Sequence, residues 1–71
     1  MEAWKIRWLR QRLDLTQEKF AQKVGVVYST VNRWESGKIE PRGLSIKEIE
    51  RIAEKAGINL ARITRPKRRK D

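Results

Sequence analysis

At 71 residues the chain is long enough for one small domain, and its lack of cysteine and histidine removes disulfides, thiolates and the commonest metal ligand and general base. No nucleophile and base pair, phosphate-cradling glycine loop or metal-ligand cluster can be assembled from the other residues, so we expect no enzyme, no metal and no cofactor. No apolar run approaches the roughly 20 residues that cross a bilayer, which predicts a soluble cytoplasmic protein without a membrane partner.

The first predicted helix covers about residues 2–13, where apolar residues recur at the steps of three and four that mark one helix face. Trp4 and Trp8 lie four residues apart on this helix, but they are offset from that apolar stripe. An exposed pair of indoles would suggest a protein interface, because tryptophan is enriched at binding hot spots. The alternative is that the two side chains extend a small core.

A second helix is predicted over about residues 17–24. Thr16 is a good N-cap before it, and Gly25 suits the left-handed residue that closes a helix. Only three residues separate this helix from a third, predicted over about 28–36. Two helices joined by so short a turn indicate a helix-turn-helix unit.

A fourth helix is predicted after the loop that contains Pro41, with Ser45 and Glu48 as its capping box. Gly57 supplies its stop. Asn59 can then cap a short fifth helix that runs to about Ile63.

Together these elements predict an all-α fold, a compact bundle of about five short helices. Residues 1–64 are expected to form the domain, and residues 65–71 a basic flexible tail. The formal charge is +9, and the last ten residues hold six of the 18 basic residues and one acidic residue. Such a tail can serve solubility, or it can attract a polyanion, either nucleic acid or an anionic membrane surface.

Two segments, residues 15–26 (LTQEKFAQKVGV) and residues 29–37 (STVNRWESG), resemble the Cro and repressor type (XRE, lambda-repressor-like) helix-turn-helix family of phage and bacterial regulators. The similarity extends more weakly over about residues 5–63. The resemblance implies a lambda-repressor-like fold and a sequence-specific regulator of transcription, such as a Cro-like repressor. It also implies a homodimer on double-stranded DNA, in a prokaryotic or phage-type, nucleoid-associated setting.

The solvent side of the third helix is expected to read the major groove. Arg33 can pair with both acceptors of guanine, and Asn32 can pair with adenine. For both residues the alternative is a plain solvated side chain. This alternative has more weight for Asn32 than for Arg33. Ser29 and the Tyr28 hydroxyl can reach base edges or phosphate, while Val27 can touch a thymine methyl.

Contacts to the DNA backbone are implied by the same resemblance. Gln17 would bind phosphate at the second helix's N-terminus, whose free amides add to that contact. Lys38 and Arg42 would clamp the backbone from the loop after the third helix, and plain solvation is their alternative. Thr16 is assigned to this group too, although its safer role is the helix cap.

Arg10 and Glu35 look like the family's buried ion pair, which would tie the first helix to the end of the third. Trp34 is expected to be a large core or rim anchor rather than a base-stacking platform. Val27 stands where the family usually has a capping Ser or Thr, so the third helix is expected to begin without that cap. Asp14, where the family often has Gly or Asn, tolerates the left-handed conformation.

Other partners remain open at this point. The chain could be an antitoxin or bridging factor whose main partner is a protein bound through Trp4, Trp8 or the tail. It could also bind DNA nonspecifically through the charge of the tail alone. If it forms the homodimer, the contacts are expected near Leu60 and Ile63.

Overall fold

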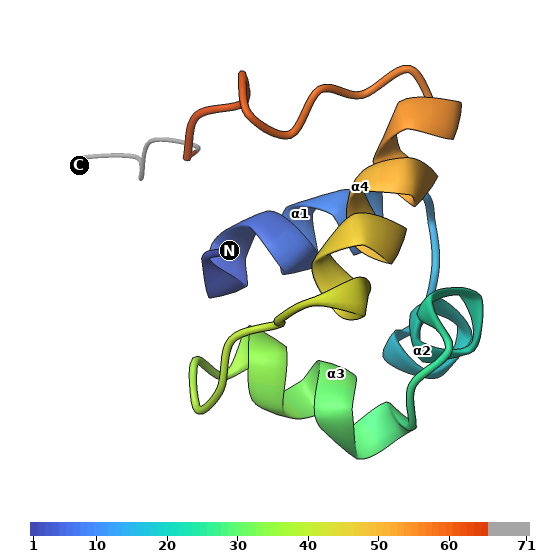
Figure 1. The fold of residues 1–71 in the computed structure, drawn as a ribbon, viewed down its shortest axis with the longest axis vertical. Coiled ribbons are helices and arrows are strands. Elements are labelled where there is room, and N and C mark those ends of the chain that lie inside the picture. Colours follow the sequence, from blue (N-terminus) through green and yellow to red (C-terminus); the bar gives the residue numbers. More distant parts are fainter. Residues whose placement is uncertain (66–71) are drawn as a thin grey trace, which may run out of the picture.

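The computed structural model describes residues 1–65, and within that range it contains four helices and no strand (Figure 1). The predicted all-α fold is confirmed. None of the helices between residues 1 and 65 combines the length and apolar character that crossing a bilayer requires. Apart from Arg65, the predicted basic tail lies outside the described residues. The helices are α1 (Ala3–Arg12), α2 (Gln17–Val24), α3 (Tyr28–Glu35) and α4 (Leu44–Lys55).

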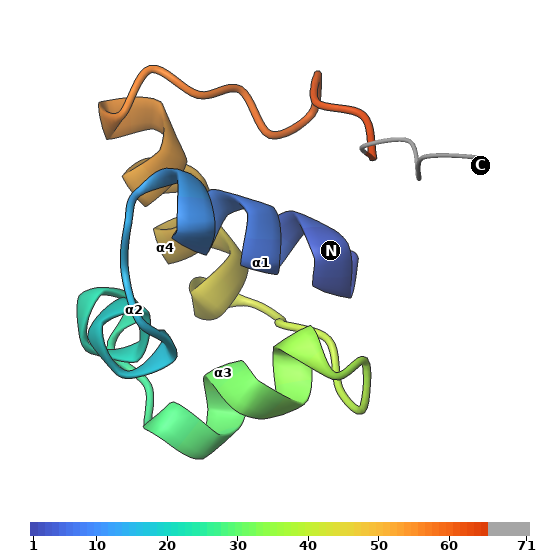
Figure 2. The same cartoon turned by 180° about the vertical axis from the view of Figure 1, so that it is seen from behind.

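One apolar core joins all four helices, and the ribbons close around it in both views (Figures 1 and 2). Fully burying an aliphatic or aromatic side chain contributes about 1.5–3 kcal/mol, so a few such residues dominate the stability of a domain this small. The five largest fully buried side chains are Phe20, Ile6, Leu9, Ile49 and Val31.

The predicted ends of α2 are confirmed. The Thr16 hydroxyl oxygen accepts a hydrogen bond from the Lys19 N–H at 3.1 Å. At the other end Gly25 has φ 93°, in the left-handed region, and its N–H donates to the Ala21 carbonyl at 2.8 Å. Asp14, in the turn before α2, also adopts the left-handed conformation expected of it, with φ 60°.

We expect Thr16→Ala to lower the free energy of unfolding by about 1 kcal/mol, because the Lys19 N–H loses its acceptor at the start of α2. Urea denaturation followed by circular dichroism measures this difference. Thr64→Ala, an exposed threonine outside the helices, is the matched control and should change little. Equal effects from the two substitutions would contradict the capping role.

The predicted capping box at the start of α4 is wrong. The helix begins at Leu44, and its N-cap position is Gly43 with φ 53°, two residues before the predicted cap Ser45. Ser45 therefore lies within the first turn of the helix rather than ahead of it. The Glu48 carboxylate accepts a hydrogen bond from Arg51 Nη2 at 2.8 Å, one turn along the same helix.

The predicted fifth helix is also wrong, because the segment after α4 forms a single turn. The Asn59 side-chain oxygen accepts from the Ala61 N–H at 3.0 Å, and the Arg62 N–H donates to the Asn59 carbonyl at 3.0 Å. So short a segment has too few hydrogen bonds to repay helix nucleation. Leu60 anchors this turn in the core and is only 7 % exposed, whereas Ile63 is half-buried. A dimer contact near these two residues stays a prediction.

After that turn the chain runs back along α1 toward its N-terminal end (Figures 1 and 2). Arg65 reaches a shallow hollow that Trp4 and Trp8 also line. Both indoles are half-buried, and Trp8 packs against the core. Trp8 therefore extends the core, while a protein interface through the pair stays a prediction.

Candidate nucleic-acid interface

Helices α2 and α3 pack against each other across a turn of residues 25–27 (Figure 1). Ala21 is 2 % exposed, and a side chain this small lets the two helices approach closely. The Ala21 carbonyl accepts from the N–H groups of both Gly25 and Val26, which closes the turn. Val26 is half-buried and packs against the core. The unit is a helix-turn-helix.

Helix α3 has one buried and one exposed face. Val31 and Trp34 are buried, so the prediction that Trp34 is a core anchor is confirmed. The opposite face carries side chains that the core does not use, and together with the helix start it includes two exposed hydrophobic side chains, at 65 % for Val27 and 52 % for Tyr28. The exposed residues at this face and at the helix start are Val27, Tyr28, Ser29, Asn32 and Arg33.

The start of α3 agrees with the prediction as well. Val27 occupies the N-cap position with extended backbone, and its apolar side chain offers no acceptor to the first amides. Its carbonyl accepts from the Thr30 N–H at 3.0 Å. The first two amides of the helix, those of Tyr28 and Ser29, are therefore left without a side-chain cap.

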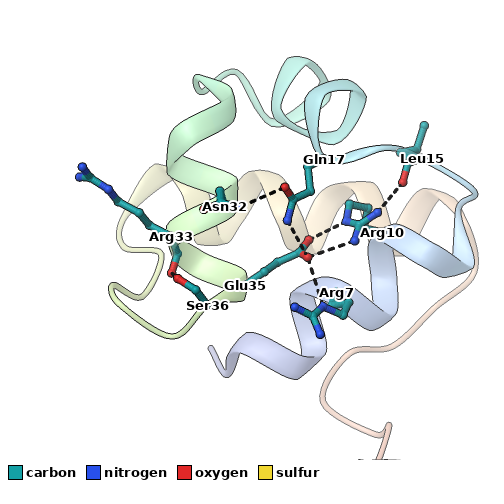
Figure 3. Close-up of polar contacts among 8 residues, drawn as sticks. All are labelled: Arg7, Arg10, Leu15, Gln17, Asn32, Arg33, Glu35 and Ser36. Carbon is teal, nitrogen blue, oxygen red and sulfur yellow. Dashed lines mark hydrogen bonds and ion pairs between the residues drawn. The ribbon is translucent and has the colours of Figure 1, made fainter.

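A buried carboxylate lies at the end of α3, where Glu35 faces α1 (Figure 3). Its side chain is 1 % exposed. Arg10 donates two hydrogen bonds to this carboxylate, from Nε to Oε2 at 2.6 Å and from Nη2 to Oε1 at 3.1 Å. Arg10 Nη1 also donates to the Leu15 carbonyl at 2.9 Å, which ties α1 to the segment before α2.

Two more donors reach the same carboxylate: Arg7 Nε at 3.3 Å and Gln17 Nε2 at 3.0 Å. Burial raises the pKa of Glu35, but the hydrogen bonds from Arg10 and Gln17, the charge of Arg10 and the hydrogen bond from Arg7 outweigh burial. The pKa of Glu35 therefore lies below its ordinary value. The group remains a carboxylate at neutral pH.

Gln17 links this cluster to the exposed face of α3. As the first residue of α2, it lies beside that face, and its Oε1 accepts a hydrogen bond from Asn32 Nδ2 at 3.3 Å. Figure 3 shows Gln17 between Asn32 and the Glu35 cluster, while Arg33 extends away from that cluster. A residue assigned to phosphate and a residue assigned to a base are thus joined before any DNA binds.

The loop between α3 and α4 carries two exposed cations, Lys38 and Arg42. Both line a groove beside α3, together with the hydroxyl-bearing residues Thr30 and Ser45. The Glu40 carboxylate lines the same groove, and the N-terminal ammonium of Met1 pairs with it at 3.2 Å. With that carboxylate paired, two positive charges and two hydroxyls in one groove are suited to phosphate oxygens. The proximity of these two hydroxyls to the cations could not be predicted from the sequence, because it depends on how the loop folds.

Comparison with known families agrees with this geometry. A protein-family model described as Helix-turn-helix matches residues 6–63. The chain belongs to the Cro/XRE-type helix-turn-helix family. Searches of curated proteins and of solved structures each gave no match.

Membership of this family makes the chain a DNA-binding helix-turn-helix regulator. The match includes α2, α3 and α4 completely and most of α1. Within the helix-turn-helix domain the candidate DNA-binding surface consists of the polar face of α3, the start of α2 and the loop with Lys38.

Arg7 belongs to the cluster around the Glu35 carboxylate, and no role was predicted for it from the sequence. A signal was available, because Arg7 and Arg10 are three residues apart and share a face of α1.

Proposed function

We propose that this chain represses transcription by binding double-stranded DNA in a sequence-specific manner, with α3 lying in the major groove. The observation that supports this most directly is the division of α3. Val31 and Trp34 hold the helix on the core, and the opposite face is left free with polar and aromatic side chains. Helices of this size fit the major groove, where every base pair presents a distinct pattern of donors and acceptors.

The proposed readers differ in chemistry. Arg33 is exposed and carries a planar fork of donors that matches guanine O6 and N7. Asn32 offers both a donor and an acceptor, as adenine requires. Ser29 and Tyr28 contribute hydroxyls, and Val27 contributes methyl groups for a thymine C5-methyl.

The proposed phosphate contacts surround that helix. Lys38 and Arg42 lie in the groove after α3, and Gln17 lies at the start of α2. One hydrogen of the Gln17 amide is engaged by Glu35, which leaves the second for a phosphate oxygen. Thr16 accepts from the Lys19 N–H, and its hydroxyl hydrogen remains able to donate.

We further propose that two copies bind two half-sites about one helical turn apart, roughly 34 Å, as dimeric helix-turn-helix proteins do. In vitro selection on random duplex DNA tests this directly. A palindromic site with that spacing supports a homodimer, and a single undivided site would contradict it. Sedimentation of the complex on the selected site gives the number of chains bound.

Arg33→Ala should weaken binding to the selected site by about 1–3 kcal/mol and relax the preference at one base pair. Lys38→Ala should instead weaken binding to all sequences by a similar factor and reduce the salt slope by about one. Titrations on the selected site and on its single-base variants, at several salt concentrations, separate the two effects. Equal losses on every sequence from both variants would overturn the proposed specificity.

A further inference from the structure

Three polar side chains form a continuous hydrogen-bonded line from the buried Glu35 carboxylate, through Gln17, to Asn32 on the exposed face of α3 (Figure 3). We propose that Gln17 is a positioning residue for base readout, because it fixes which atoms of the Asn32 amide face the DNA. This inference rests on the proposed function. It gives Gln17 a role beyond the phosphate contact.

The direction of each hydrogen bond in this line is set by the carboxylate. An ionised carboxylate can only accept, so Gln17 must present its NH₂ group to Glu35. Its oxygen then points the other way, toward Asn32. Because Gln17 Oε1 can only accept, Asn32 has to present a donor to it, and that donor is Nδ2. The amide of an isolated Asn32 could rotate by half a turn at little cost, but here rotation would set two oxygens against each other.

The fixed end of the line is well held. The Glu35 side chain is 1 % exposed and receives two hydrogen bonds from Arg10. Gln17 is half-buried at the start of α2, whereas Asn32 is exposed. The buried pair of Arg10 and Glu35 thus fixes the Gln17 side chain, which in turn orients the exposed side chain of Asn32. A side chain that is already oriented loses less conformational freedom on binding, and this favours affinity.

The orientation has a consequence for the base that is read. One Nδ2 hydrogen of Asn32 is given to Gln17, so the second hydrogen and Oδ1 remain for DNA. A neighbouring donor and acceptor match adenine, whose N7 accepts and whose N6 donates in the major groove. We therefore assign adenine to Asn32.

The test is Gln17→Met, which keeps the length of the side chain and removes both hydrogen bonds. In the wild-type protein we expect about tenfold preference for adenine at the base pair read by Asn32, as for a good amide-to-adenine contact. In Gln17→Met that preference should fall to within about threefold, while the preference at the base pair read by Arg33 is unchanged. Gln17→Met combined with Asn32→Ala should lose no more preference at that base pair than Asn32→Ala alone, because the two residues act as one unit.

Gln22→Met, on the exposed side of the same helix, is the matched control and should keep every base preference. A uniform loss of affinity on all sequences from Gln17→Met would make Gln17 a phosphate contact only and overturn the inference, while the proposed function stands. A wild-type protein that selects no sequence would overturn the proposed function itself.

A measurement without DNA examines the same link. In ¹⁵N-resolved NMR spectra of the free protein, the Asn32 side-chain amide signals should shift in Gln17→Met and stay in place in Gln22→Met. Backbone signals that match the wild type elsewhere would show that each variant is folded. Unshifted Asn32 amide signals in Gln17→Met would overturn the inference.

Discussion

Arg10→Met is expected to lower the free energy of unfolding by about 3–5 kcal/mol, because it leaves the Glu35 carboxylate buried without its main partner. Arg7 and Gln17 still donate to the carboxylate, but Arg7 is 55 % exposed and its contact is longer, at 3.3 Å. Urea denaturation at pH 7 measures the loss. A domain of this size has roughly 4–10 kcal/mol in total, so losing this partner removes a large share of its stability.

Arg51→Met is the matched control, since Arg51 also donates to a glutamate, at 2.8 Å. That pair lies on the surface of α4, where water solvates both charges and the contact adds little. Its removal should therefore change the denaturation midpoint far less. Similar losses from Arg10→Met and Arg51→Met would show that burial of the Glu35 pair contributes nothing special.

The pH dependence gives this prediction a second, independent readout. The pKa of Glu35 is below its ordinary value of 4.5 in the folded protein, so its pairing stabilises the fold above that pH. This contribution is lost as the pH falls through the lowered pKa. In Arg10→Met the pKa of Glu35 is higher, because burial raises it and the opposing charge and hydrogen bonds of Arg10 are gone. Protonation of Glu35 then removes the unpaired buried charge. The difference in stability between wild type and variant should therefore narrow on acidification.

The ends of α2 could be predicted because their signals are local. Thr16 and Gly25 act on amides and carbonyls a few residues away, so their roles can be deduced from the sequence. The start of α4 could not be predicted in the same way. Ser45 and Glu48 have the spacing of a capping box, but the positive φ of Gly43 lets the helix begin before them. The sequence contains two possible starts for α4, at Gly43 and at Ser45, and the folded backbone uses the one at Gly43.

The segment after α4 could not be predicted for a different reason. Asn59 does accept a hydrogen bond from the backbone two residues on, as a capping residue can. The path of the chain beyond Asn59 depends on Leu60, which is drawn into the core beside the other helices. That contact is tertiary, and a capping signal carries no information about it.

The candidate site shows the same division. Helical spacing was enough to predict that Val31 and Trp34 face the core and that Asn32 faces solvent. The link from Asn32 through Gln17 to Glu35 depends on how α2 and α3 cross and on the rotamers of three side chains. Periodicity specifies faces, whereas contacts between faces of different helices come only from the folded chain.

Trp34→Ala is expected to lower the free energy of unfolding by about 3–5 kcal/mol, since Trp34 is 3 % exposed and its removal leaves a large cavity under α3. Tyr28 provides the matched control, because it is an aromatic residue of the same helix on the opposite face and is 52 % exposed. Tyr28→Ala should change stability by less than about 0.5 kcal/mol. Thermal denaturation of both variants measures the contrast.

For DNA binding by folded protein we expect the opposite order: substitution of Tyr28 should matter more than substitution of Trp34. Tyr28→Ala keeps the fold and removes a hydroxyl and a ring from the exposed face, so its affinity for the selected site should fall. Trp34→Phe retains most of the buried ring and none of the indole N–H, and it should bind that site as the wild type does at a temperature where both are folded. Loss of base preference in a folded Trp34→Phe would mean that the indole contacts DNA. In that case the division of α3 into a core face and a reading face would be wrong at Trp34.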